Sequence, residues 1–248
     1  MTRQAIAGLA LATTIATAAY AGGTDAPQAE AAISTPSKWS MSEDFTYFNY
    51  ENDDTLLSFS TAFALALDNG GTLSLSLPVY NEDGDTNVGD LKVGADFNAF
   101  KGEGWNLGLG GGVYLPVGAE EFDSTNINPF FTGKFSTKLG DFDLVQTAEY
   151  RFVGSDAFTP WLGTSTDSDI LSLGTLLSLS WGNLTVGADL TQLYYIQSEE
   201  NQIFVGPAAS LKVSDTISLD GGVQFPISQD VSGTEVDIVV GVGLGIKF

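Results

Sequence analysis

Residues 90–100 read Asp-Leu-Lys-Val-Gly-Ala-Asp-Phe-Asn-Ala-Phe, so apolar side chains alternate with polar or small ones. Successive side chains of an extended strand point to opposite faces, which would give this segment one apolar face and one polar face. The apolar face would carry Leu91, Val93, Ala95, Phe97 and Ala99. A strand of about this length crosses a bilayer when it is tilted. The segment therefore predicts a membrane-spanning strand.

The same alternation recurs from Trp39 to the C-terminus, without helical periodicity. If both ends of the barrel lie on the periplasmic side, the number of strands must be even. We predict an all-β fold, a transmembrane antiparallel up-and-down β-barrel of about twelve strands. The expected strands are residues 39–50, 55–67, the alternating leucines of 73–77, 90–100, 105–116, 128–139, 142–152, 169–181, 184–196, 202–213, 216–227 and 235–248.

The predicted connections alternate between tight turns and longer loops. Outer-membrane barrels show this pattern, with the short turns facing the periplasm and the long loops outside. The expected short turns are residues 69–71, 101–104, 140–141, 182–183 and 214–215, and the longer loops include 81–88, 117–127 and 153–168.

The N-terminus has the features of an export signal. A charged start with Arg3, an apolar small-residue run and Ala19-Tyr20-Ala21 match the three regions of a signal peptide. We predict a cleavable signal peptide at residues 1–21, a flexible periplasmic lead-in at 22–38 and the barrel domain at 39–248.

Alternation alone leaves open which face of the wall lines the interior, because a soluble sandwich or lipocalin-like barrel would bury the apolar face. Strand length and the signal peptide favour the membrane. Aromatic belts at two interfaces would support it. We expect one belt from Phe100, Trp105, Phe142, Trp181 and Phe248, and the other from Tyr80, Tyr114, Phe130, Tyr150, Phe152, Tyr194, Tyr195, Phe204 and Phe225.

Residues 236–248 alternate apolar residues with Asp, Gly and Lys and end in Phe248. This run resembles the C-terminal strand of Gram-negative outer-membrane proteins. The resemblance implies recognition by the barrel assembly machinery and a location in the outer membrane, in contact with its lipid and lipopolysaccharide.

Composition excludes several functions. A formal net charge of −22 argues against nucleic-acid binding, which needs a basic surface. The chain contains no Cys and no His, so it lacks the usual general base and the commonest transition-metal ligand. We predict no enzyme activity, no cofactor and no metal site. A Ser-Lys pair from Ser136 with Lys134 or Lys138 remains an arithmetical possibility.

If the apolar face meets lipid, a set of charged residues faces inward. Glu149 and Asp143 would pair with Lys134, Lys138 and Arg151, either to brace the barrel or to form a selective constriction. The candidate pore-lining residues are Asp90, Lys92, Asp96, Lys134, Lys138, Asp143, Glu149, Arg151, Asp189, Lys212 and Asp220.

The longer loops are acidic. Two interpretations remain open: an acidic mouth that concentrates cations and binds divalent ions bridging to lipopolysaccharide, or simple solvation in a salty habitat. The loop acids are Glu51, Asp53, Asp54, Glu82, Asp83, Asp85, Glu120, Glu121, Asp123, Asp156, Asp167, Asp169, Glu199, Glu200 and Asp230.

Two short motifs, Gly89-Asp90-Leu91 and Leu115-Pro116-Val117-Gly118, resemble those of the family named for the MetA pathway of phenol degradation. In that family a G-D-L strand precedes an apolar strand that ends in L-P-T-G, and Val117 stands here in place of the Thr. The resemblance implies an outer-membrane transporter, with small apolar or aromatic compounds as solutes.

The leading functional prediction is a pore or substrate-specific channel for the passive passage of small solutes. The alternative is a non-conducting structural or interaction barrel that acts through its acidic outer loops.

Overall fold

The computed structural model describes residues 39–248 apart from residues 53, 68, 69, 83, 119–125, 156 and 233. The predicted signal peptide and lead-in lie outside the described residues, as do the loop acids Asp53, Asp83, Glu120, Glu121, Asp123 and Asp156. Within the described part of the chain, no helix is long and apolar enough to cross a bilayer.

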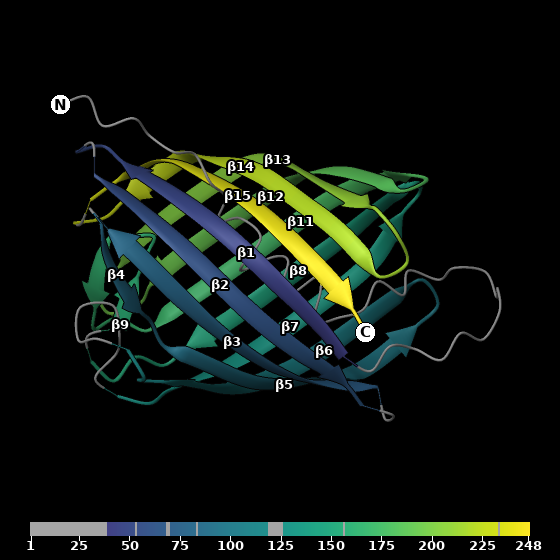
Figure 1. The fold of residues 1–248 in the computed structure, drawn as a ribbon, viewed down its shortest axis with the longest axis horizontal. Helices are drawn as coiled ribbons and strands as arrows, with labels where there is room; N and C mark the ends of the chain where they lie inside the picture. The colour runs from purple at the N-terminus through teal and green to yellow at the C-terminus, as the bar shows by residue number, and fades with distance from the viewer. Residues whose placement is uncertain are drawn as a thin grey trace.

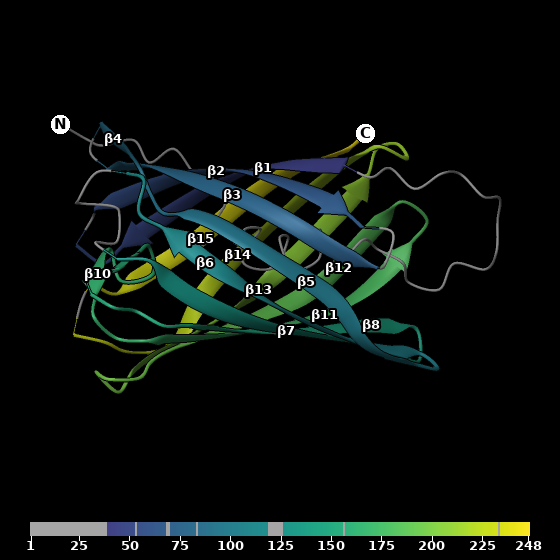
Figure 2. The ribbon, with the colours of Figure 1, turned by 90° about the horizontal axis from the view of Figure 1, so that it is seen from below.

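The described strands form a closed antiparallel barrel (Figures 1 and 2). Thirteen strands share one sheet in the order β2-β1-β15-β14-β13-β12-β11-β8-β7-β6-β5-β3-β4, and the pairing of β2 with β3 closes the ring. Since β4 pairs with β3 alone, the ring itself has twelve strands, which confirms the predicted fold class. The long strands are β1 (Trp39–Tyr50), β2 (Thr55–Ala66), β3 (Gly71–Glu82), β5 (Leu91–Gly102), β6 (Trp105–Leu115), β7 (Asn128–Leu139), β8 (Phe142–Arg151), β11 (Ile170–Trp181), β12 (Leu184–Tyr195), β13 (Glu200–Lys212), β14 (Ile217–Asp230) and β15 (Val236–Lys247).

Three short strands occupy segments that we predicted as loops. β4 (Asp85–Val88) folds back on β3, and β9 (Ala157–Thr159) pairs with β10 (Thr164–Thr166) as a separate hairpin. Both lie at the end of the barrel opposite the C-terminus, the left end in Figure 1. That end carries the long connections and is the extracellular end of the predicted topology.

The outer wall is apolar and the inner wall is largely polar. On β2, Phe59 is 53% exposed whereas its neighbours Ser58 and Ser60 are buried inside. A soluble barrel would place these side chains the other way round, so the barrel is a transmembrane one. The exposed aromatic residues Trp105 and Trp181 stand at short-turn ends, as an interfacial belt requires. The apolar wall of the barrel therefore faces lipid.

The predicted outer aromatic belt was wrong for five of its members. These five side chains lie near the extracellular end as expected, but they point into the barrel and not toward lipid. Inside the barrel they pack against other aromatic rings. The five residues are Tyr80, Tyr114, Phe130, Tyr195 and Phe204.

The start of β15 also differs from the expected alternation. The register with β1 shifts between Asn49 and Tyr50, so that Val236 is fully buried and Asp237 is exposed. A β-bulge adds one residue to one strand and thereby reverses which face the following side chains take. Asp237, which alternation had placed inside, instead accepts a hydrogen bond from the outward Asn49 amide at 3.4 Å.

Candidate functional site

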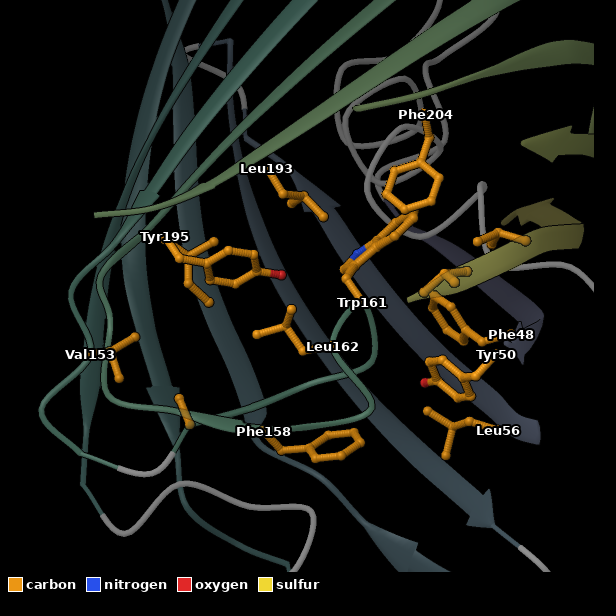
Figure 3. Packing of buried hydrophobic residues seen from close by; sticks show 14 residues of the cluster. Phe48, Tyr50, Leu56, Val153, Phe158, Trp161, Leu162, Leu193, Tyr195 and Phe204 are labelled. Carbon is orange, nitrogen blue, oxygen red and sulfur yellow. The ribbon is translucent and has the colours of Figure 1, made fainter. Parts of the chain in front are cut away.

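The connection between β8 and β11 spans residues 152–169, and we call it the lumen loop. Its described part carries a hairpin that folds into the barrel instead of standing above it. It contains the β9–β10 hairpin, whose turn brings Trp161 and Leu162 into the interior (Figure 3). Both side chains are at least nine-tenths buried. A long segment without such contacts would be expected to lie on the surface, so this burial indicates a specific role in the barrel mouth.

Side chains from several strands surround the lumen loop. The Trp161 ring lies 5.3 Å from that of Phe48 on β1 and 4.8 Å from that of Phe204 on β13. Phe158 of the loop packs edge-to-face on Tyr80 of β3 at 5.0 Å. The buried cluster comprises Phe48, Tyr50, Leu56, Val153, Ala157, Phe158, Trp161, Leu162, Ile170, Leu193, Tyr195, Phe204, Val236 and Val239. It is an apolar core built across the extracellular end of the barrel.

Barrel side chains also satisfy backbone groups of the loop. The Tyr50 hydroxyl donates a hydrogen bond to the Pro160 carbonyl at 2.6 Å, and the Gln202 amide donates one to the Trp161 carbonyl at 2.9 Å. Because unpaired carbonyls in such a buried place are costly, these two bonds make the inward position of the hairpin tenable.

Asp169 holds the base of the loop. Its carboxylate accepts hydrogen bonds from the Val153 backbone N–H at 2.7 Å and from the Tyr150 hydroxyl at 2.8 Å. Partial burial opposes ionisation, but these hydrogen bonds outweigh it and lower the pKa of the Asp169 carboxyl. Asp169 was predicted as a member of an acidic rim, and its structural partners were not visible in the sequence.

We expect acid to weaken this anchor only at low pH. The folded-state pKa lies below the unfolded value of about 3.9, so the stabilisation is fully present above that value and is lost as the pH falls through the folded-state pKa. Asp169→Asn should therefore loosen the lumen loop at neutral pH, measured as faster protease cleavage within residues 152–169. Asp230→Asn, an exposed acid at the same end, is the matched control. Equal cleavage of the two variants would contradict the anchoring role.

A second cluster lies on the inner face of β5 to β8, where most of the predicted pore-lining residues meet. Lys92 pairs with Glu149, which also accepts a 2.6 Å hydrogen bond from the Tyr114 hydroxyl. Arg151 pairs with Asp90, and both are largely buried. The predicted partners of Glu149 and Arg151 on the facing strand were therefore wrong, because these charges reach across β6 and β7 to the start of β5. The expected pair of Lys138 with Asp143 is present at 3.0 Å.

Aromatic rings support the cations of this cluster. The Lys92 ammonium lies 4.5 Å from the centroid of Phe130, and the Arg151 guanidinium lies 4.0 Å from that of Tyr114. The Phe130 ring can lie over β6 and β5 because Gly112 and Gly94 lack side chains there. A Cβ on Gly112 would come within 2.8 Å of the Phe130 ring and 2.0 Å of the Val93 carbonyl oxygen.

Gly112→Ala should therefore destabilise the barrel, by about 1–3 kcal/mol for an overpacked position. Gly133→Ala on the neighbouring β7 is the control, since a Cβ there meets no atom within 4 Å. Urea unfolding of both variants in lipid vesicles measures the difference. Equal unfolding midpoints would show that the missing side chain at Gly112, beneath Phe130, does not contribute to stability.

The opposite inner wall carries acids. Asp189 on β12 accepts a hydrogen bond from the Gln224 amide on β14, which also bonds the Thr191 hydroxyl at 2.9 Å. Asp44 on β1 is not among the predicted pore-lining residues. Its carboxylate accepts a hydrogen bond from the Ser42 hydroxyl at 3.3 Å and is repelled by the charge of Asp220. The alternation of β1 places Asp44 on the inner face, together with Ser42 and Thr46.

The remaining candidates are dispersed. Lys134 and Asp96 attract one another on β7 and β5, whereas Lys212 pairs with Asp215 in a periplasmic turn, away from both clusters. Small side chains line the rest of the periplasmic half of the wall, including Ser42, Ala62, Ala64, Ser74, Gly108, Gly110, Ser178, Gly187, Ala208, Gly222, Gly243 and Gly245. Among the residues that the structure describes, no three acidic side chains come together in a way that could hold a metal ion.

A family model for the MetA-pathway of phenol degradation matches residues 18–237. The chain belongs to this family. No curated protein matches the sequence.

Solved structures with the same fold are outer-membrane barrels. The COG4313 outer membrane channel from Pseudomonas putida F1 is similar with a TM-score of 0.62 and 14% identity, over 91% of this chain and 100% of that one. For the NanC porin the TM-score is 0.60 at 9% identity, over 85% and 100% of the two chains. The KdgM porin gives 0.54 at 15% identity, over 84% and 99%. At these identities the likeness shows the fold.

The two motifs of the MetA-pathway family meet in space. Leu91 pairs with Leu115 across β5 and β6, and a Cβ on Gly118 would lie 1.6 Å from the Val88 carbonyl oxygen. Asp90 of the first motif forms an ion pair with Arg151 of β8. In this chain the motif residues therefore build the extracellular end of one hairpin and hold a buried ion pair there.

Proposed function

We propose that the protein is a passive channel for small solutes across the outer membrane, and that the lumen loop sets the opening of its outer end. The observation that carries this proposal is the contrast between the two halves of the inner wall. Small side chains line the periplasmic half, while a single folded segment and its apolar cluster occupy the extracellular half. A barrel stabilised only by a filled interior would need bulky side chains along its whole length.

The inner charges support selectivity. On the β5–β8 wall the basic residues are matched by acids, whereas Asp44, Asp189 and Asp220 face them from the other side. With the acidic outer loops added, this distribution favours cations over anions in the lumen. Divalent ions bridging the loop acids to lipopolysaccharide belong to the same proposal. The pore-lining role of the candidate residues is part of it too.

Solute passage is also in keeping with the similar barrels, two of which are named as porins and one as a channel. A KdgM porin has been solved in complex with disordered oligogalacturonate. We propose no enzymatic reaction, because the lysines beside Ser136 are engaged with acids, Lys134 with Asp96 and Lys138 with Asp143.

A non-conducting structural barrel is the second candidate, and the buried cluster across the mouth favours it. Single-channel recording of the refolded mature chain in a planar bilayer separates the two. Steady openings, with a reversal potential on the cation-selective side in a salt gradient, are expected. A folded barrel that stays silent, including after removal of the side chains of the lumen loop, would overturn the channel.

A further inference from the structure

The Glu43 carboxyl group lies within the apolar part of the lipid-facing wall. Glu43 on β1 has the opposite strand parity to Ser42 and Asp44, which are buried inside. On the outer face it accepts a hydrogen bond from the Thr61 hydroxyl of β2 at 2.8 Å. The surrounding outer face is apolar and aromatic: Met41, Phe45, Phe59, Phe63, Val242 and Leu244.

Glu43 lies deep in the apolar band. It follows the interfacial Trp39 by four residues, which places it roughly 10 Å above the periplasmic belt on a strand tilted by about 40°. The outward polar pair of Asn49 and Asp237 marks the other edge of the band. A glutamate side chain is much shorter than the lysine and arginine side chains that snorkel to an interface. An ionisable group at this depth is costly and calls for a polar partner.

A polar partner of matching chemistry stands on the far side of the same barrel. Gln146 on β8 is exposed on the outer face, next to Thr175 of β11. It follows the interfacial Phe142 by four residues, so it lies at the same depth as Glu43. Within the described residues its amide finds no hydrogen-bond partner. Its lipid-facing neighbours include Leu144, Ala148, Phe135, Leu173 and Leu177.

The two sites are diametrically opposed. Between β1 and β11 lie β15, β14, β13 and β12, and between β2 and β8 lie β3, β5, β6 and β7, so four strands separate the sites on either side. A contact between unlike patches of two copies is heterologous, and it extends in a row when the patches face opposite directions. A two-fold dimer through the Glu43 patch would instead bring Glu43 against Glu43 and leave the Gln146 carboxamide of each copy facing lipid.

We infer that copies of this chain associate side by side in the membrane, with the Glu43–Thr61 pair of one copy receiving the Gln146 carboxamide of the next. The Gln146 amide N–H groups donate hydrogen bonds to the Glu43 carboxyl oxygens. In this contact both polar groups are removed from the surrounding lipid acyl chains. Hydrogen bonds between side chains hold membrane-embedded segments together in this way, since packing against lipid gives little preference for association. Rows of barrels would follow, with one lumen in each copy.

Thiol cross-linking in phosphatidylethanolamine–phosphatidylglycerol vesicles tests the contact, and the chain has no Cys of its own. Phe45→Cys and Ala148→Cys place thiols two residues above Glu43 and Gln146 on the outer face. A mixture of the two variants should cross-link with a short bismaleimide, whereas each variant alone should not. Self-linking of the Phe45→Cys variant would indicate a two-fold dimer, and no linking at all would indicate monomers; either result overturns the proposal.

Substitutions then test the hydrogen bond itself. Gln146→Leu in the Ala148→Cys chain should lower the cross-linked fraction roughly 3- to 20-fold, the effect of one hydrogen bond in a membrane. Glu43→Gln keeps a hydrogen-bonding group and should retain association. Gln192→Leu, another outward polar residue on β12, is the control and should change nothing. Leucine suits the lipid-facing wall, so folding is preserved. Cross-linking is read independently of conductance, and either proposal can fail without the other.

Discussion

Replacing Trp161 and Leu162 together with alanine should raise the single-channel conductance several-fold. Both side chains belong to the buried cluster, in which the Trp161 ring contacts Phe48 of β1 and Phe204 of β13. Without them the lumen loop loses the apolar contacts that hold it across the mouth. Ions would then pass directly into the periplasmic half of the interior, where many inward side chains are small.

The size of the expected effect follows from the packing lost. Truncation of a buried tryptophan costs about 3–5 kcal/mol and of a buried leucine about 2–5 kcal/mol. Local openings of a loop require less free energy than global unfolding, so a loss of this size shifts the loop toward its released state. The hydrogen bonds from Tyr50 and Gln202 remain, but they contribute about 1 kcal/mol each and cannot retain the hairpin alone.

The matched control is Trp181→Ala with Leu184→Ala, the same two residue types on the lipid-facing wall. That variant leaves the interior unchanged and should conduct like the parent. Both proteins are compared in planar bilayers after their folding has been checked by heat-modifiable migration. If the Trp161 and Leu162 variant is folded and its conductance matches that of the control, the lumen loop does not close the barrel.

Removing Arg151 should have the largest effect on stability. Arg151→Met leaves the carboxylate of Asp90 buried without its cation, and breaking a buried ion pair from one side costs about 3–5 kcal/mol. The same change takes one positive charge from the inner wall, so permeability should shift further toward cations. Urea unfolding in vesicles measures the first effect and the reversal potential in a salt gradient measures the second.

Lys138→Met is the comparison for this prediction. Its pair with Asp143 is more exposed, with 44% and 29% of the two side chains accessible, so its loss should cost less than about 1 kcal/mol. Adding Asp90→Asn to Arg151→Met should restore part of the stability, because the unpaired charge is gone. Equal unfolding midpoints for Arg151→Met and Lys138→Met would show that burial adds nothing to the pair of Arg151 with Asp90.

Strand positions were predictable because alternate side chains of a β-strand face opposite sides, which gives the sequence a local polarity pattern of period two. Residues 90–100 are an example: alternation identified both the strand and the inward face that carries Lys92 and Asp96. The ends of the strands and their order around the barrel followed from turn lengths and from the short connections of an up-and-down barrel.

Partners across the lumen were not predictable in the same way. Alternation says that Glu149 and Lys92 share the inner face, but β6 and β7 separate their strands, and only the absence of side chains at Gly94 and Gly112 lets Phe130 lie flat beneath Lys92. The bulge that turns Val236 inward depends on pairing between β1 and β15, the two ends of the chain.

The sequence by itself therefore determined the class of fold, the number of strands in the ring and the face of the inward charges other than Asp237, because these depend on local alternation and on the apolarity that lipid demands. Tertiary structure alone decided that Trp161 and Leu162 turn inward, that Asp90 meets Arg151, and that Glu43 and Gln146 lie at equal depth on opposite walls. The physical reason is that these relations join residues distant in the chain, and closure of the ring sets the distances between them.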